Sequence, residues 1–367
     1  MKKRLFSLLL VSALVFTLSG CGEKSLLRES DPVTLNFWHV YGEQSGSPMD
    51  LLVQKFNRTV GQEKGVRVQV TNLSSASKIG GFLKEAQKGG RDAPEMPDLF
   101  TCHISDATAL GSDNLVDWNA RFTAEELSNF VPGFLADGMT EDGTLLLFPI
   151  SKSTQLLMCN GSGFARSLAQ GHVVVSDLYS NTQVMTGDVL SGLGSSAAIL
   201  YYNDTVTYRD GTQEPMDLHV LPMPKTAGAD ALMTQAGVGL CAYKTTDQKA
   251  EAAALFVRWL TESERNLDFV AQTGYMPVRN GAFDAIENYD KFPEPTESYR
   301  QLYAALKIMQ ESYTPLSEPR FEGYYGKVSQ LYDGLRQMQQ KLPARAAAGE
   351  SIDTLAEETW ALLCAIH

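Results

Sequence analysis

The chain has 367 residues, a hydrophobic fraction of 44% and a formal net charge of −12 at pH 7. That length exceeds what one small core needs and predicts two lobes. The strongly acidic balance argues against binding nucleic acid and against a polybasic grip on lipid headgroups.

The first 20 residues predict an export signal. Lys2, Lys3 and Arg4 precede an apolar run over residues 5–18, which is shorter than the ~20 residues that span a bilayer. Ser19 and Gly20 then stand before Cys21. This end resembles the lipobox of bacterial lipoproteins, which implies a diacylglyceryl group on Cys21 and a tether over residues 21–32. A plain secretory signal with an accidental cysteine is the alternative.

The remaining cysteines are Cys102, Cys159, Cys241 and Cys364. No two are closely spaced, so the sequence contains neither a CxxC redox pair nor a zinc knuckle. We expect small buried thiols, with one disulfide left open because the compartment is extracytoplasmic. The sequence predicts no metal and no cofactor.

Strands and helices alternate in the first third of the chain. Residues 33–40 predict a strand, residues 49–59 a helix, residues 66–70 a strand, residues 78–88 a helix and residues 97–100 a third strand. This order predicts a doubly wound parallel sheet, in which ligands lie beyond the carboxyl ends of the strands.

Later segments predict a second set of strands followed by helices. The strand-like runs are residues 144–150, 155–160, 196–202, 218–220 and 238–243. Residues 245–261 predict a helix that begins with a capping box of Thr245 and Gln248. Residues 298–366 are mostly helical by pattern, with an interruption at 315–320.

Several motifs in order resemble the extracellular solute-binding proteins of ABC importers, in the group that binds maltose and other sugars. They are residues 34–39 (TLNFWH), 97–100 (PDLF), 145–150 (LLLFPI), 156–160 (LLMCN), 194–200 (GSSAAIL), 221–225 (LPMPK), 237–240 (GVGL) and 273–278 (TGYMPV). Each motif is weak alone, but together they cover nearly the whole mature chain.

The resemblance implies an α/β, two-lobed, periplasmic-binding-protein-like (type II) fold. Lobe one would comprise residues 33–152 and 239–311, and lobe two residues 153–238 and 312–367. Residues 161–185 are polar and irregular where the family carries a long helical stretch, so we expect lobe two to be abbreviated.

The resemblance also implies a mechanism in which the two lobes close on a solute by a hinge motion and present it to a membrane permease. Sugars bind aromatic faces and polar groups between the lobes. The candidate ligand-binding residues are Trp38, His39, Tyr41, Gln44, Ser74, His103, Asp106, Lys152, Ser153, Tyr201, Tyr275 and Tyr324. For each one, core packing, a cap or a turn is the alternative, and Lys152 could equally pair with an acid.

Three functions follow from the sequence. The first is a lipid-anchored, extracytoplasmic binding subunit whose partners are a small solute, with a carbohydrate as the first expectation, and ABC permease subunits. The second is a lipoprotein of the same fold that acts as a sensor or adhesin. The third is a surface glycoside hydrolase, for which no carboxylate pair stands out. No Gly-x-Ser-x-Gly or paired-histidine zinc motif supports an enzyme.

Overall fold

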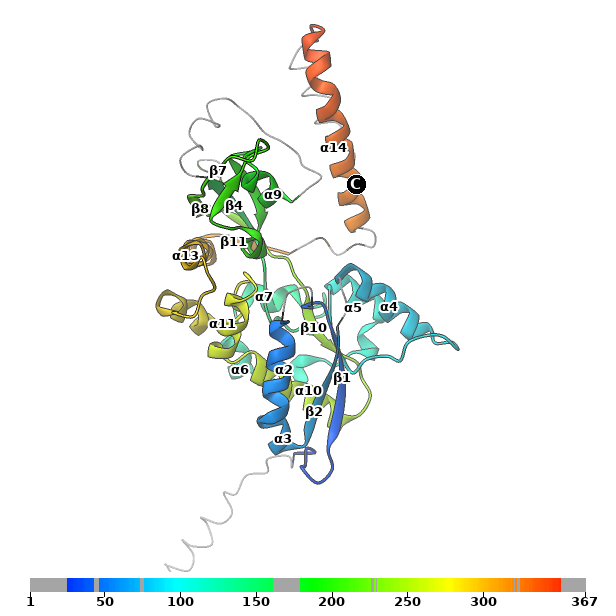
Figure 1. The fold of residues 1–367 in the computed structure, drawn as a ribbon. Coiled ribbons are helices and arrows are strands. Elements are labelled where there is room, and N and C mark those ends of the chain that lie inside the picture. Colours follow the sequence, from blue (N-terminus) through cyan, green and yellow to red (C-terminus); the bar gives the residue numbers. More distant parts are fainter. Residues whose placement is uncertain are drawn as a thin grey trace, which may run out of the picture.

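The computed structural model describes residues 25–42, 46–72, 76–160, 179–225, 228, 230–317, 319, 321 and 324–350. Two bodies lie one above the other in Figure 1, with the first sheet in the lower body and the strands of residues 155–221 in the upper one. We call them lobe one and lobe two.

Lobe one is built on a four-stranded sheet of order β10-β3-β1-β2. Its strands are β1 (Val33–His39), β2 (Val66–Asn72), β3 (Leu99–Cys102) and β10 (Gly239–Ala242). β1 pairs in parallel with β2 and β3, and β10 is antiparallel to β3. The parallel sheet predicted from the first third of the chain is therefore confirmed, with one antiparallel strand added from later in the sequence.

Helices cover this sheet. They are α2 (Pro48–Arg58), α3 (Val60–Lys64), α4 (Ala76–Lys88), α5 (Ile104–Leu110), α6 (Ala124–Ser128), α7 (Pro132–Asp137), α10 (Asp247–Leu260), α11 (Ser263–Ala271) and α12 (Asn280–Ala285), with short 3-10 turns at Ser112–Asn114, Trp118–Ala120 and Ile286–Asn288. The buried ring of Phe256 lies 5.8 Å from Phe37 and 5.0 Å from Phe56, centroid to centroid. These edge contacts join α10, β1 and α2 into one core.

Lobe two contains a three-stranded antiparallel sheet of order β5-β4-β8. Its elements are β4 (Gln155–Asn160), α9 (Ser180–Met185), β5 (Ser191–Ser195), a 3-10 helix η3 (Ser196–Tyr201), β6 (Thr205–Thr207), β7 (Gln213–Pro215), β8 (Leu218–Leu221) and β9 (Leu232–Thr234). β9 pairs in parallel with β11 (Thr314–Leu316) from the far end of the chain. The size of lobe two relative to its relatives stays a prediction, because residues 161–178 lie outside the described part.

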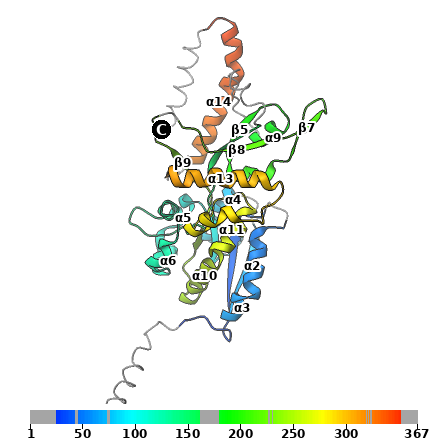
Figure 2. The same cartoon turned by 90° about the vertical axis from the view of Figure 1, so that its left-hand side faces the viewer.

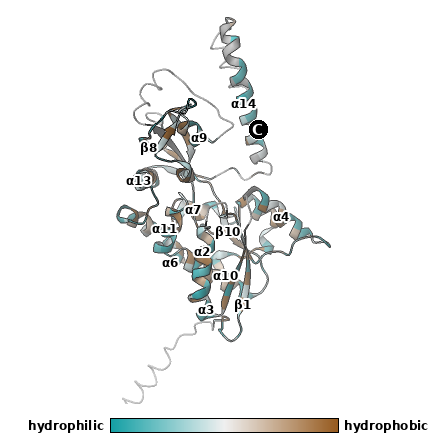
Figure 3. Ribbon diagram, in the orientation of Figure 1, coloured by the Kyte–Doolittle hydropathy of each residue, from teal (hydrophilic) through white to brown (hydrophobic). Residues whose placement is uncertain are grey.

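Two long helices end the described chain. α13 (Thr296–Ser312) lies between the two bodies in Figure 2. Its Gln301 side chain accepts a hydrogen bond from Val220 N of β8 at 3.1 Å, and its Tyr303 hydroxyl donates to Val270 O of α11 at 2.7 Å. α13 therefore contacts both lobes, and the division of the chain at residues 311/312 stays a prediction. α14 (Tyr324–Ala347) projects beside lobe two, and the parts of it that are coloured in Figure 3 are mainly hydrophilic.

Three local predictions are wrong. Residues 144–150 form no strand, because Phe148 N bonds to Leu240 O while Leu146 N bonds to Gly138 O. Residues 196–201 form a 3-10 helix, and the Ser195 side chain caps its start by accepting from Ala197 N at 3.3 Å. The helix at 247–260 is capped by Thr246 rather than by Thr245.

Candidate functional site

Segments from both lobes meet at what we call the lobe junction, formed by residues 151–154, 235–237 and 273–276. Ser153 and Ala236 exchange two backbone hydrogen bonds of 3.0 Å. Lys152 N donates to Met276 O at 3.2 Å. The chain crosses between the lobes here, so a change in the relative orientation of the lobes acts on these residues first.

On the lobe-one side, Tyr41 lies two residues beyond β1 and is buried. Its hydroxyl lies 3.0 Å from Ser151 Oγ, and its ring meets Tyr275 edge-on at 6.1 Å and Phe269 at 5.1 Å. Burial raises the pKa of Tyr41 well above its ordinary value, so this phenol stays neutral. Tyr41 therefore locks the end of β1 to the crossing segment.

His39 is fully buried at the end of β1. Tyr41 N donates to its Nδ1 at 3.2 Å, so the ring hydrogen of the neutral form lies on Nε2, which donates to Asp50 Oδ1 at 2.8 Å. Burial lowers the pKa of His39, and the Asp50 hydrogen bond and charge oppose this shift only in part. His39 is thus a neutral link between β1 and α2.

Lys152 pairs with an acid, as one of the two sequence interpretations predicts. The residue is 1% exposed, and its ammonium group contacts the Asp137 carboxylate at the end of α7. A buried pair of this kind costs desolvation on both sides, but removing one partner leaves a buried charge. The pair fixes the first crossing segment to lobe one.

The lobe-two side differs, because buried polar atoms there have no partner. Among the described residues, Thr154 Oγ1, Ser196 Oγ and Gln235 Oε1 are buried without a hydrogen bond. Ser196 N donates to Thr154 O at 2.8 Å, which places the two hydroxyl-bearing residues side by side. An unsatisfied buried hydroxyl costs stability unless water or a ligand bonds to it.

Gly274 lets the two sides approach closely. It adopts φ +68°, and a Cβ on it would lie 2.9 Å from Ser196 O and 2.9 Å from Ala197 Cα. Only glycine combines this left-handed backbone with so close an approach. The TGYMPV motif of lobe one therefore lies directly against the start of η3.

The other sequence-predicted residues lie around the junction or apart from it. Trp38 is partly buried and packs against the smaller core cluster of lobe one, which includes Phe100 and Cys102. At the start of α5, the Asp106 carboxylate accepts from His103 N at 3.4 Å, and burial raises the pKa of Asp106. Gln44, Ser74 and Cys21 lie outside the described residues.

Two predicted tyrosines and one serine complete the set. Tyr201 at the end of η3 is 56% exposed, whereas its neighbour Tyr202 is buried. The Tyr324 ring at the start of α14 meets Phe321 edge-on at 5.5 Å. Ser153 is buried at the crossing itself. The structure therefore gathers His39, Tyr41, Lys152, Ser153 and Tyr275 at one place, and their contact with a solute stays a prediction.

Sequence reasoning left out Asp50, Asp137, Ser151, Ser196 and Gln235. Ser151 lies between two strand-like runs, and Ser196 lies in the GSSAAIL motif, so both stood in segments that the sequence had already marked. No sequence pattern marks Asp137 or Gln235 as a site residue, because each meets its partners only through tertiary packing.

Over the described residues, no group of three or more His, Cys, Asp or Glu side chains is arranged to hold a metal ion. Over the same residues, no helix has the length and apolar character needed to cross a membrane.

One family model matches the central part of the chain. Residues 164–294 match the family described as bacterial extracellular solute-binding protein. Among curated proteins, none matches the chain. The family resemblance indicated by the sequence is thus supported by a match in the central part of the chain.

Solved structures show the fold over almost the whole chain. The cyclic α-maltosyl-1,6-maltose binding protein of Arthrobacter globiformis matches with TM-score 0.62 at 14% identity, over 91% of this chain and 99% of that chain. UgpB of Mycobacterium tuberculosis, in complex with glycerophosphocholine, matches with TM-score 0.61 at 16% identity, over 90% and 98%. The sugar-binding protein MalE of Xanthomonas citri matches with TM-score 0.60 at 14% identity, over 89% and 95%. The chain has the two-lobed fold of solute-binding proteins.

Proposed function

We propose that this protein is the lipid-anchored, extracytoplasmic solute-binding subunit of an ABC importer, and that its solute is a carbohydrate. The observation that carries the proposal is the two-lobed solute-binding fold, which matches sugar-binding proteins over about nine-tenths of the chain. The family match supports it, as does the predicted export signal over residues 1–20, which stands directly before Cys21. The proposed anchor is a diacylglyceryl group on the Cys21 sulfur.

The solute would bind between the lobes at the junction. The hydroxyls of Thr154 and Ser196 would bond to the solute, which removes the cost of leaving them unsatisfied. Tyr275 is partly buried, and Tyr201 is the exposed tyrosine near the end of η3, so both can offer ring surface to the C–H faces of a sugar. Contact with both lobes stabilises the closed form by the difference in affinity between the two forms.

A thermal-shift screen tests the proposal. We expect one class among mono- and oligosaccharides to raise the unfolding temperature, since a ligand at 100 times its Kd adds about 2.7 kcal/mol of stability. Glycerophosphodiesters belong in the panel, because the glycerophosphocholine complex has the same fold. A folded protein that no solute stabilises would overturn the proposal. Mass spectrometry of the chain purified from membranes tests the anchor separately, with Cys21→Ser as its control.

A further inference from the structure

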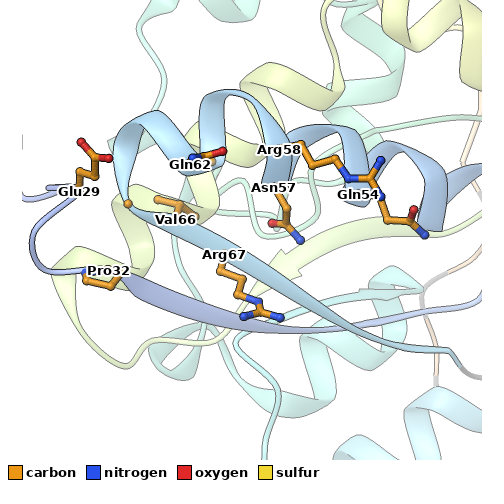
Figure 4. Close-up of a pocket in the computed structure, with 10 residues that line it drawn as sticks. Glu29, Pro32, Gln54, Asn57, Arg58, Gln62, Val66 and Arg67 are labelled. Carbon is orange, nitrogen blue, oxygen red and sulfur yellow. The ribbon is translucent and has the colours of Figure 1, made fainter.

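A pocket with charged and amide side chains in its lining lies at the other end of lobe one, away from the lobe junction. It has a volume of about 520 Å³ and is lined by residues of α2, α3, the start of β2 and the segment before β1. In Figure 4 Arg58 and Asn57 project from α2, Arg67 from β2, and Glu29 belongs to the preceding segment. β1 runs from this end of the sheet to His39 at the junction, so the two sites lie at opposite ends of one strand.

The two arginines give the pocket its chemistry. Arg58 and Arg67 are exposed, and no ion pair or hydrogen bond engages either guanidinium in the described part of the chain. A guanidinium fork matches the geometry of phosphate oxygens. Gln54 and Gln62 add amide groups around them, whereas the Asn57 amide is bonded to the backbone N and O of Val68 at 2.8 Å each. Glu29 also lines the pocket and offsets one of these two charges, so the lining keeps one net positive charge, a local exception to the acidic balance of the whole chain.

The pocket is also tied to the tether. The Glu251 carboxylate of α10 accepts from Ser25 Oγ at 2.7 Å and from Leu26 N at 2.9 Å, and Gln248 Nε2 donates to Asp31 O at 3.2 Å. Gly65 leaves room for the tether, since a Cβ there would lie 2.1 Å from Arg28 O. Residues 25–32 are therefore held against lobe one beside the pocket.

This attachment sets how far the pocket can lie from a lipid on Cys21. Between Cys21 and Ser25 the chain has four peptide units, which span at most about 14 Å. That reach is comparable to the distance over which an anionic membrane surface attracts a cation. A lipid on Cys21 would therefore hold the end of lobe one that carries Arg58 and Arg67 near the membrane surface.

We propose that this pocket binds the phosphate of an anionic phospholipid headgroup and orients lobe one on the membrane. The proposal rests on the proposed lipid anchor. The occupant is a lipid phosphate rather than a free anion, because the tether that lines the pocket is the segment leading to the lipid. Solute binding at the junction stays independent, since it uses the opposite end of β1.

Vesicle binding tests the pocket without the anchor. The probe is phosphatidylcholine vesicles with and without phosphatidylglycerol at low salt, and the protein is the chain from residue 22 onward, which keeps every described residue but has no lipid. We expect measurable binding only with phosphatidylglycerol. The double variant Arg58→Gln/Arg67→Gln should bind about 25-fold more weakly, since each cation near an anionic surface contributes about 1 kcal/mol.

The matched control is Lys88→Gln/Arg91→Gln, which removes the same charge at the end of α4. It should leave vesicle binding within about twofold of wild type. An equal loss in both double variants would overturn the proposal, because net charge alone would then explain the binding. Inorganic phosphate that binds while vesicles do not would also overturn it.

Different outcomes would contradict the proposed anchor and the proposed headgroup site. Vesicle binding by the unlipidated chain together with an unmodified Cys21 would contradict the anchor and leave the headgroup site standing. A lipidated Cys21 with no preference for phosphatidylglycerol would contradict the pocket and leave the proposed transport function intact.

Discussion

The two sides of the lobe junction differ in whether their buried polar side chains have hydrogen-bond partners. On the lobe-one side, His39, Tyr41 and Lys152 each bond to a named partner, and all three are buried. On the lobe-two side, Thr154 and Ser196 are equally buried but their hydroxyls have no partner. Lobe one thus offers a satisfied and rigid surface, whereas lobe two carries groups that a solute would stabilise.

The largest expected effect is on the lobe-one side. Asp137→Ala leaves the Lys152 ammonium buried without its partner and should lower the free energy of unfolding by about 3–5 kcal/mol. Urea denaturation measures it. The control is Arg209→Gln, which breaks an exposed pair with Asp188 and should cost under about 1 kcal/mol. Equal losses of unfolding free energy in the two variants would show that the buried pair does not stabilise the junction.

Gly274→Ala tests the close approach of the two sides. Its Cβ would meet Ser196 O and Ala197 Cα, and alanine is strained at φ +68°, so we expect a loss of about 1–3 kcal/mol and weaker solute binding. Gly211→Ala is the matched control, because it has φ +85° but nothing within 4 Å of the added carbon. If Gly274→Ala binds the solute with unchanged affinity, the close contact at Gly274 does not contribute to the solute site.

Two single-atom deletions should differ in their effect on stability. Tyr41→Phe loses the hydrogen bond to Ser151 and should cost about 0.5–1.5 kcal/mol. Ser196→Ala removes a buried hydroxyl that has no partner and should leave the solute-free protein as stable or more stable. Thermal unfolding of both variants measures this, and a Ser196→Ala variant as destabilised as Tyr41→Phe would contradict the asymmetry.

The smallest expected effect is a pH dependence from His39. Its pKa in the folded protein is lowered below the ordinary 6.5, so between the two values the unfolded chain binds a proton that the folded protein does not. The contribution of His39 to the free energy of unfolding is fully present above pH 6.5. It decreases as the pH falls below 6.5. Asp50 faces the ring and opposes the shift only in part.

His39→Gln should remove this component of the pH dependence, which chemical denaturation over pH 5 to 8 measures against wild type. A wild-type slope that His39→Gln leaves unchanged would assign the pH dependence to other groups.

Much of the fold follows from local patterns in the sequence. Alternation predicted β2 near residues 66–70, and apolar spacing predicted α2 within one residue of its observed start. The run at 144–150 failed because its backbone groups bond separately to Gly138 and Leu240. The run at 196–202 failed because Ser195 caps a turn at its start.

The site was harder to predict than the fold. The end of β1 was recognisable, because aromatic residues follow a parallel strand where ligands usually lie. However, Tyr41 turns inward and bonds to Ser151, 110 residues later in the chain. The partners of Lys152 and Gln235 also come from tertiary packing, which no spacing in the sequence reveals.

Calorimetric titration of a solute found in the screen tests the central claim most directly, with wild type and the double variant Thr154→Val/Ser196→Ala compared side by side. The account predicts that the double variant stays folded and binds about 5- to 140-fold more weakly, because two hydroxyl contacts are each worth about 0.5–1.5 kcal/mol. Unchanged affinity in a folded double variant would contradict the claim that the solute binds at the lobe-two side of the junction.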